Sequence, residues 1–186
     1  MYIGPLLREQ LLRLTVFVIT NILMAMGKAI QGAGIQAEIK QNKPFRTLED
    51  EAVVALHRTA DQLQGRFSDM LKPHGLSPTQ FNALRILRGA GEAGRACSEI
   101  AERMINRDPD ITRLVDRLER RGLVVRSREG RDRRVIITRI TPAGLELLRG
   151  LDRPTEEFNR RSLAHLGQKD LRTLIKLLEA ARKQEG

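Results

Sequence analysis

The sequence predicts a mainly α-helical protein with one small β-hairpin, on three observations. Apolar residues recur every three to four positions over most of residues 48–182, which is the spacing of amphipathic helices. Three helical stretches begin with a capping residue followed by proline, at Ser77, Asp108 and Thr141. Two short runs rich in β-branched residues flank a polar loop and predict the hairpin: Leu123–Arg126 and Val135–Ile140.

The composition agrees with a globular protein that binds a polyanion. The chain has 186 residues, 41% of them apolar, and a formal net charge of +10. This length suits one domain with helical extensions, or two very small domains. The basic balance indicates nucleic acid or an anionic membrane surface as partner. A single cysteine excludes an internal disulfide and favours a reducing compartment. The low aromatic content favours double-stranded over single-stranded nucleic acid.

Residues 1–47 are predicted to form an N-terminal extension or arm. Leu14–Met26 is uncharged over 13 residues, which is short for a membrane span. Three interpretations stay open. Translation starts at Met24 or Met26, so that residues 1–25 are an artefact; the run is an extra apolar helix for self-association; or it is a signal or membrane anchor.

The helices before the hairpin follow in order from Leu48. An apolar stripe from Val53 to Met70 predicts a long helix, which Lys72–Gly75 ends. Ser77 and Pro78 begin the next helix, and Gln80 is placed to complete a capping box. Two further elements are a turn and a short helix, at Gly89–Gly94 and Cys97–Met104.

After the hairpin, Thr141 and Pro142 begin another helix. It runs over Ala143–Arg153, and Pro154 is expected to break or kink it. Two more helical stretches, separated at Gly167, follow at Phe158–Leu166 and Leu171–Arg182. We expect the apolar stripes at Leu63/Phe67 and Leu174/Leu178 to form dimer or domain core.

The helix expected at Pro109–Arg121 has two faces. One face is apolar with core spacing, at Ile111, Leu114, Val115 and Leu118. The other is polar, at Thr112, Arg113, Asp116, Arg117 and Arg120. A helix with such a face fits the major groove of duplex DNA. With the preceding helix Ser98–Arg103 and the turn Ile105–Arg107, it forms a helix-turn-helix.

The segment from Arg103 to Arg139 carries twelve arginines, no lysine and six acids, which is +6 of the total charge of +10. Guanidinium groups match phosphates and base edges better than ammonium groups do. In the hairpin loop, three arginines are placed to enter a minor groove or bind the backbone, with Asp132 expected to hold one of them: Arg131, Arg133 and Arg134. The alternative is a solvated basic face on a helical protein.

Four stretches resemble the MarR family of winged-helix transcription regulators. They are LSPTQFNALRIL (76–87), SEIAERM (98–104), DITRLVDRLERRGLVVR (110–126) and DRRVIITRITPAG (132–144). The resemblance covers about three quarters of the chain, from Leu48 to Arg182. It implies a winged helix-turn-helix domain with N- and C-terminal dimerisation helices, over residues 48–186, with a DNA-binding core at about residues 76–141.

The resemblance also implies a function. Family members are homodimers that bind pseudo-palindromic double-stranded DNA in the cytoplasm, most often as repressors. Many are released by a small aromatic or phenolic ligand, and some branches are controlled by cysteine oxidation. Asp132 and Arg134 match the wing signature, with Arg134 as the minor-groove arginine. The residues expected to contact DNA are Ser98, Asp110, Thr112, Arg113, Arg117, Arg131, Asp132, Arg133 and Arg134. Two features depart from the family: the apolar N-terminal extension, and the acids in Asp108–Asp110 where the helix approaches phosphate.

Nothing in the sequence predicts catalysis. The histidines are scattered without metal-ligand spacing, and no phosphate-binding loop or nucleophile motif is present. We expect no enzyme activity, no metal and no cofactor, and we expect Cys97 to be a packing residue. The alternatives to a DNA-binding regulator are a winged-helix protein-interaction module without DNA binding, an enzyme, and a membrane-attached regulator.

Overall fold

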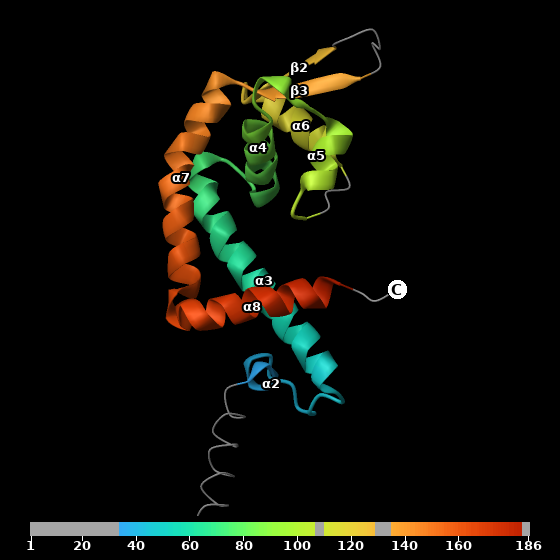
Figure 1. Ribbon diagram of the computed structural model, residues 1–186, viewed down its shortest axis with the longest axis vertical. Helices are drawn as coiled ribbons and strands as arrows, with labels where there is room; N and C mark the ends of the chain where they lie inside the picture. Colours follow the sequence, from blue (N-terminus) through green and yellow to red (C-terminus); the bar gives the residue numbers. More distant parts are fainter. Residues whose placement is uncertain (1–33, 107–109, 129–134, 184–186) are drawn as a thin grey trace, which may run out of the picture. The chain divides into compact units, whose positions relative to one another are not determined.

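The computed structural model describes residues 34–106, 110–128 and 135–183 (Figure 1). The apolar run Leu14–Met26 lies outside the described residues, as do Asp108, Pro109 and the tip of the hairpin. The chain divides into two compact units between Asp61 and Gln62. The predicted division between residues 47 and 48 stays a prediction. Within the described residues, no helix has both the length and the apolar character needed to cross a membrane.

The first unit contains the short helix α2 (Ile35–Glu38) and the N-terminal part of α3 (Leu48–Leu71). Thr47 caps α3, because its hydroxyl accepts a hydrogen bond from the backbone N–H of Asp50 at 3.1 Å. Arg58 of α3 pairs with Glu38 at 2.9 Å, and this hydrogen bond raises the pKa of Arg58. Val53 and Leu56 are 56% and 50% exposed, so the apolar stripe is not covered in this part of α3.

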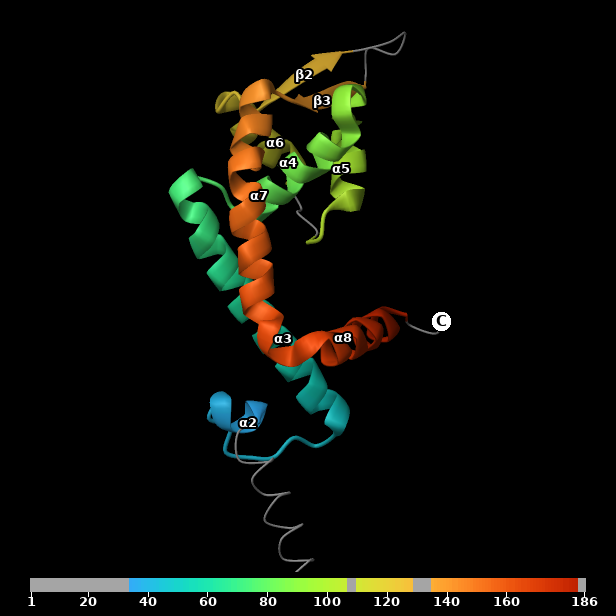
Figure 2. The same cartoon turned by 60° about the vertical axis from the view of Figure 1, so that its left-hand side comes forward.

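The second unit holds the remainder of α3 and the elements after it. They are η1 (Lys72–His74), α4 (Pro78–Ala90), η2 (Gly91–Ala93), β1 (Arg95–Ala96), α5 (Cys97–Arg103), α6 (Ile111–Arg120), β2 (Val124–Arg128), β3 (Ile136–Ile140), α7 (Pro142–Leu163), η3 (Ala164–Leu166) and α8 (Gly167–Arg182). Helices α4, α5 and α6 gather beside the β2–β3 hairpin (Figure 2). The mainly helical fold with a small hairpin is confirmed.

Two of the three predicted helix N-termini lie within the described residues, and both have the predicted cap. Ser77 and Gln80 form a capping box, with Ser77 Oγ accepting from Gln80 N at 3.2 Å and Gln80 Oε1 accepting from Ser77 N at 3.0 Å. Thr141 caps α7 by accepting from Gly144 N at 3.1 Å. Gly75 and Gly122 take left-handed conformations after the preceding helices, with φ of 65° and 69°.

The sheet contains a strand that the sequence did not predict. In the described chain the strand order is β1-β3-β2, and both pairings are antiparallel. Arg95 pairs with Thr138 and Ala96 with Ile137, so β3 is the central strand. Gly94, just before β1, has φ of 63°, and a Cβ there would lie 2.6 Å from the carbonyl oxygen of Thr138. Only glycine allows the chain to approach β3 so closely at this point.

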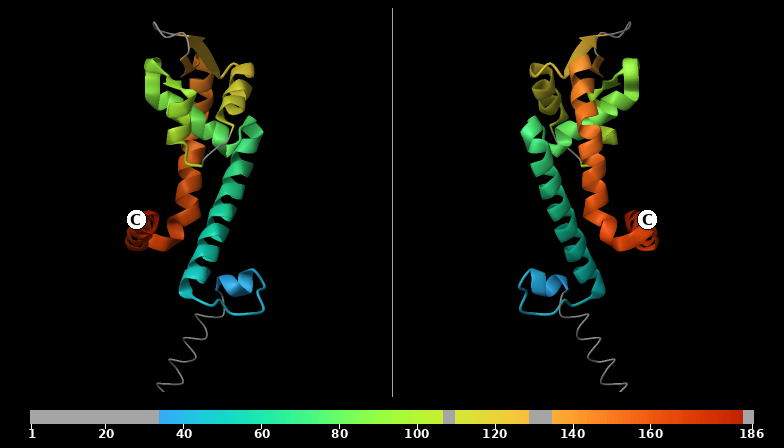
Figure 3. Two further views of the ribbon diagram at one scale, coloured as in Figure 1. Left: turned by 90° about the vertical axis from the view of Figure 1, so that its right-hand side faces the viewer. Right: turned by 90° about the vertical axis from the view of Figure 1, so that its left-hand side faces the viewer.

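Helix α7 does not end at Pro154. It continues to Leu163, so the expected break at Pro154 and the separate helix at Phe158–Leu166 are wrong. Side chains on both sides of the proline are packed: Leu151 is fully buried, Thr155 is 9% exposed, and the ring centroid of Phe158 lies 5.2 Å from that of Phe67. The break instead falls at η3, and Gly167, with φ of 68°, lets α8 leave in another direction (Figure 3).

The core lies between α4, α5, α6 and α7. Nine large apolar side chains of the described residues are fully inaccessible to solvent: Leu71, Leu84, Leu87, Ile100, Leu114, Val115, Leu118, Leu148 and Leu151. The predicted apolar face of residues 109–121 is therefore confirmed for Leu114, Val115 and Leu118, and Ile111 packs partly buried against this core. Burial of three α6 side chains fixes which side of α6 faces solvent.

Candidate nucleic-acid interface

Helices α5 and α6 form the predicted helix-turn-helix. Glu99 begins α5 by accepting a hydrogen bond from the backbone N–H of Ala96 at 3.0 Å. At the other end, Asn82 of α4 accepts from the backbone N–H of Ile105 at 2.9 Å. The turn after α5 is thus attached to α4, while Ser98 stays exposed on α5.

The start of α6 differs from the prediction by two residues. The helix begins at Ile111, and Asp110 is its N-cap, with Asp110 Oδ1 accepting from Arg113 N at 3.2 Å. Asp110 therefore has the capping role that the sequence assigned to Asp108. The same carboxylate forms an ion pair with the Arg113 side chain, Nε to Oδ2, at 3.0 Å.

The solvent face of α6 carries most of the polar residues expected there. Thr112, Arg113, Arg117 and Arg120 are exposed. Arg117 Nε donates to the carbonyl of Arg113 at 3.3 Å, and Arg120 Nε to that of Asp116 at 3.4 Å. These bonds lay the stems of both arginines along the helix, so that one continuous strip of α6 is basic. The strip brings together three of the expected site residues: Thr112, Arg113 and Arg117.

Asp116 is an exception, because it faces the hairpin. Arg126 of β2 bonds Asp116 Oδ1 through Nη1 at 2.7 Å. It also bonds Glu119 Oε2 through Nε at 2.8 Å and through Nη2 at 2.5 Å. Glu119 Oε1 accepts from the backbone N–H of Arg126 at 3.0 Å. We call Arg126, Asp116 and Glu119 the wing-base cluster. It joins α6 to the first strand of the hairpin.

The contacts in the wing-base cluster shift the pKa values of Glu119 and Arg126. The side-chain hydrogen bonds from Arg126 hold the pKa of Glu119 below its usual value, against the effect of partial burial. Glu119 in turn raises the pKa of Arg126, and Asp116 adds to this effect. Glu119 and Arg126 are therefore both charged at neutral pH.

Two further arginines in the basic segment have internal roles. Arg121 donates to the carbonyls of Gly75 at 2.5 Å and His74 at 3.1 Å, which ties the end of α6 to the turn after α3. Arg139 of β3 donates to the carbonyl of Glu92 at 2.5 Å and to Ser127 Oγ at 2.8 Å. With Arg126, they show that part of the segment's charge holds the fold together.

The remaining expected site residues fall in the hairpin tip. Arg131, Asp132, Arg133 and Arg134 lie outside the described residues, so the expected pinning of an arginine by Asp132 stays a prediction. The strands leading to the tip are described, and Arg128 is exposed at the end of β2.

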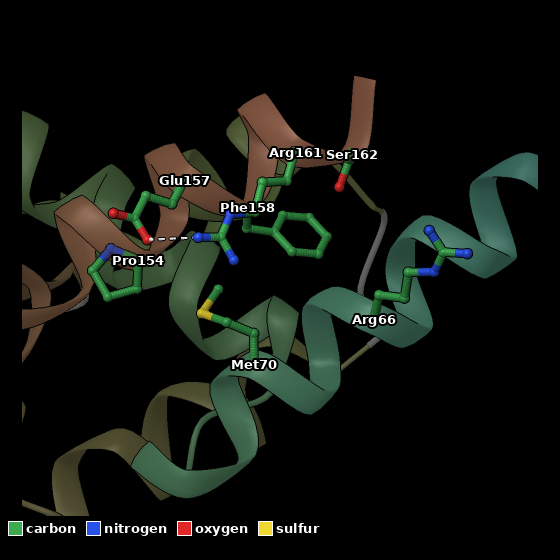
Figure 4. Close-up of a pocket in the computed structure, with 7 residues that line it drawn as sticks. All are labelled: Arg66, Met70, Pro154, Glu157, Phe158, Arg161 and Ser162. Atoms are coloured by element: carbon green, nitrogen blue, oxygen red, sulfur yellow. Dashed lines mark ion pairs between the residues drawn. The ribbon is translucent and has the colours of Figure 1, made fainter. Parts of the chain in front are cut away.

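A pocket of about 480 Å³ lies away from these residues, between α7 and the C-terminal part of α3. Phe158 reaches from α7 toward α3, where Met70 faces it (Figure 4). Its ring lies 5.2 Å from that of Phe67. Glu157 and Arg161 form an ion pair at the rim at 4.0 Å. The lining residues are Arg66, Met70, Pro154, Glu157, Phe158, Arg161 and Ser162. Within the described residues, no group of three or more potential metal ligands occurs.

Comparison with known proteins connects this geometry to one family. Residues 76–136 match a model of the MarR family. The chain is 30% identical over 95 residues to the transcriptional regulator MhqR of Bacillus subtilis, covering 51% of this chain and 64% of that protein. It is 30% identical over 122 residues to the transcriptional repressor IacR of Pseudomonas putida, covering 63% and 72%. The chain spans less than two thirds of the first relatives it matches, at 64%, 49% and 61% of their lengths.

A solved structure agrees over a longer stretch. The crystal structure of a MarR transcription factor from Planctomyces limnophilus is 41% identical, with a TM-score of 0.58. The match covers 74% of this chain and 99% of that one. The β2–β3 hairpin is thus the wing of a winged helix, and α6 occupies the place of its recognition helix. The chain belongs to the MarR family of winged-helix transcription regulators.

Proposed function

We propose that the protein is a sequence-specific, homodimeric repressor that binds duplex DNA in the cytoplasm. The observation that carries the proposal is the division of α6. Leu114, Val115 and Leu118 are buried, while Arg113 and Arg117 are exposed on the opposite side. A helix held in this way presents a rigid basic strip that fits the major groove. The name of the relative IacR, a transcriptional repressor, supports the regulatory role.

In this proposal α6 reads bases and the wing contacts the backbone or the minor groove. Thr112, Arg113 and Arg117 face the bases, and Ser98 and Arg128 are placed for phosphate. The family signature assigns the minor-groove contact to Arg134, with Arg131, Asp132 and Arg133 around it. The wing-base cluster supports this assignment, because it fixes the hairpin relative to the helix that it must assist.

Exposed apolar surface supports the homodimer. Helix α8 contains no buried residue, and Ile175 and Leu177 are 54% and 63% exposed. In the first unit, Val53 and Leu56 of α3 are also about half exposed. Ile175 and Leu177 are two residues apart and lie on different sides of α8, so both sides of this helix expose apolar side chains. Exposed apolar side chains of this kind are typical of protein–protein contacts. Ile175→Glu combined with Leu177→Glu should convert a dimer to monomers in sedimentation, and unchanged mass would contradict the proposed interface.

The pocket between α3 and α7 supports control by a small aromatic or phenolic ligand. Phe158 and Met70 offer an apolar surface, and Arg66 lies at the same pocket, where a cationic side chain favours an acidic ligand group. We propose that hydroxylated benzoic acids, or compounds of that class, release the protein from DNA. Arg66→Gln should keep DNA binding and weaken release. Equal release of both proteins at every ligand concentration would argue against this site.

The decisive experiment selects bound duplexes from random DNA and measures their affinity as salt is varied. If the dimer neutralises about 6–10 phosphates, the slope of log K against log salt is about −5 to −9. Arg117→Ala should reduce affinity at least tenfold. Arg153→Ala is the matched control, because Arg153 is an 88% exposed arginine on α7. Failure to select any duplex would leave the protein-interaction module as the better account.

A further inference from the structure

Asp110 and Arg113 form one unit at the start of α6. Asp110 Oδ1 accepts from the backbone N–H of Arg113 at 3.2 Å, and Oδ2 accepts from Arg113 Nε at 3.0 Å. The Asp110 carboxylate thus caps the helix and also binds the side chain of Arg113, the third residue of α6. The Arg113 side chain is 81% exposed, while that of Asp110 is 42% exposed.

The contact through Nε decides which part of the guanidinium is offered to a partner. Nε lies where the guanidinium group joins the aliphatic chain. The two terminal nitrogens, Nη1 and Nη2, can therefore still donate to a second acceptor. Restraining the side chain in the free protein also lowers the entropy that is lost when Arg113 binds. Asp110 therefore orients Arg113 before contact with DNA.

The negative charge of Asp110 affects whether Arg113 binds a phosphate or a base. An unpaired arginine near a helix N-terminus binds any phosphate, because both the side chain and the helix end attract anions. A carboxylate in the same place repels phosphate and weakens this sequence-independent contact. It does not disfavour a base pair that offers acceptors to the arginine and a donor to the acid.

A G·C pair meets this condition in the major groove. Guanine offers O6 and N7 as acceptors to a guanidinium, and cytosine N4 is a donor that a carboxylate accepts. A C·G pair presents the acceptors and the donor in exchanged positions. A·T and T·A pairs lack the two neighbouring acceptors that guanine offers. We propose that Asp110 is a specificity-determining residue that positions Arg113, and that together they read one G·C pair in each half-site. The inference rests on the DNA-binding function proposed above.

The test uses Asp110→Asn, because asparagine caps helices as well as aspartate does. The substitution removes the charge and replaces one of the two acceptor oxygens by an NH2 group, so that only one of the two bonds to Arg113 can form. Duplexes are selected from random DNA with the wild type and the variant, and affinities are measured for all four base pairs at each position. The wild type should require G·C at one position per half-site. In D110N this preference should fall about tenfold, within the range expected for a bidentate base contact, while binding of unrelated duplex becomes tighter.

Two controls separate specificity from charge and from folding. Glu102→Gln removes one negative charge from α5, where the Glu102 side chain is 75% exposed and lies beside Arg103. It should leave the base preference unchanged. The melting temperature of D110N should stay within about 2 °C of the wild type, since capping is retained.

A double-mutant cycle with Arg113→Ala measures the unit directly. If the two side chains read the pair as one unit, the double variant loses less G·C preference than the sum of the losses in D110N and R113A. Additive effects, or a D110N preference identical to that of the wild type at every position, would overturn the inference while leaving DNA binding intact. If the wild type selects no duplex at all, the proposed function fails and the inference fails with it.

Discussion

Replacing Glu119 by glutamine should loosen the wing from α6 without removing any apolar contact. The carboxylate accepts three hydrogen bonds from Arg126, one from the backbone and two from the side chain. A hydrogen bond to a charged group is worth about 1.5–3 kcal/mol when buried. The two side chains are 27% and 33% exposed, and glutamine keeps a carbonyl acceptor. We therefore expect the free energy of unfolding to fall by about 1.5 kcal/mol.

For a chain of this size, that change lowers the melting temperature by about 3–6 °C. The loss should depend on pH. Since the pKa of Glu119 is lower in the folded protein than in the unfolded chain, its stabilising contribution is present above the unfolded value of about 4.3. It is lost as the pH falls through the folded pKa. The melting temperatures of wild type and E119Q should therefore differ at pH 7 and converge at increasingly acidic pH.

Circular dichroism melts of both proteins from pH 7 to pH 3 measure this difference, with Glu102→Gln as an exposed acid that should change little. DNA affinity at low temperature, where both proteins are folded, should fall in E119Q because the wing is no longer held. A constant difference in melting temperature across the pH range would refute the ionic account. A change below about 1 °C at pH 7 would refute the cluster as a stabilising contact.

Three further variants test the packing around the site. Gly144→Ala should destabilise the protein severely, because its Cβ would collide with the carbonyl of Leu123 and lie 2.7 Å from Ile140 Cγ1; a normal melt would show that α7 packs differently. Leu118→Ala should cost about 2–5 kcal/mol in urea unfolding, since Leu118 is fully buried, and a loss below 1 kcal/mol would contradict its place in the core. Ser77→Ala should cost about 1 kcal/mol by loss of the capping box, and Ser77→Thr should restore most of it.

Local signals explain why much of the fold was predictable from sequence. The cap at Ser77, the cap at Thr141 and the glycine at Gly122 each act through neighbours within a few residues, so their pattern carries the information. The apolar spacing of Leu114, Val115 and Leu118 likewise fixed which side of α6 is buried. These interactions depend on short-range geometry that a sequence displays directly.

The errors have long-range causes. Strand β1 has two residues and no apolar alternation, and it exists because β3 lies beside it. Pro154 stays within α7 because the residues on both sides of it are packed by tertiary contacts, with Leu151 and Thr155 buried, and this packing outweighs the local cost of a proline. The number of arginines did not reveal which of them bind carbonyls, as Arg121 and Arg139 do. For the wing-base cluster a signal was present: Asp116 and Glu119 are three residues apart, which places two acids on one side of α6.

Pairing of Arg95 with Thr138 joins backbone segments that are far apart in the chain. Both α5 and α6 lie in the loop between these two residues, so the ladder closes around the whole helix-turn-helix. During synthesis, a ribosome must release the chain beyond Thr138 before this loop can close, and α6 emerges well before that point. Contacts of such sequence separation are slow to form, which places completion of the DNA-binding surface late in folding. A fragment that ends at Arg128 would contain both helices, yet it would lack the strand that holds their loop together.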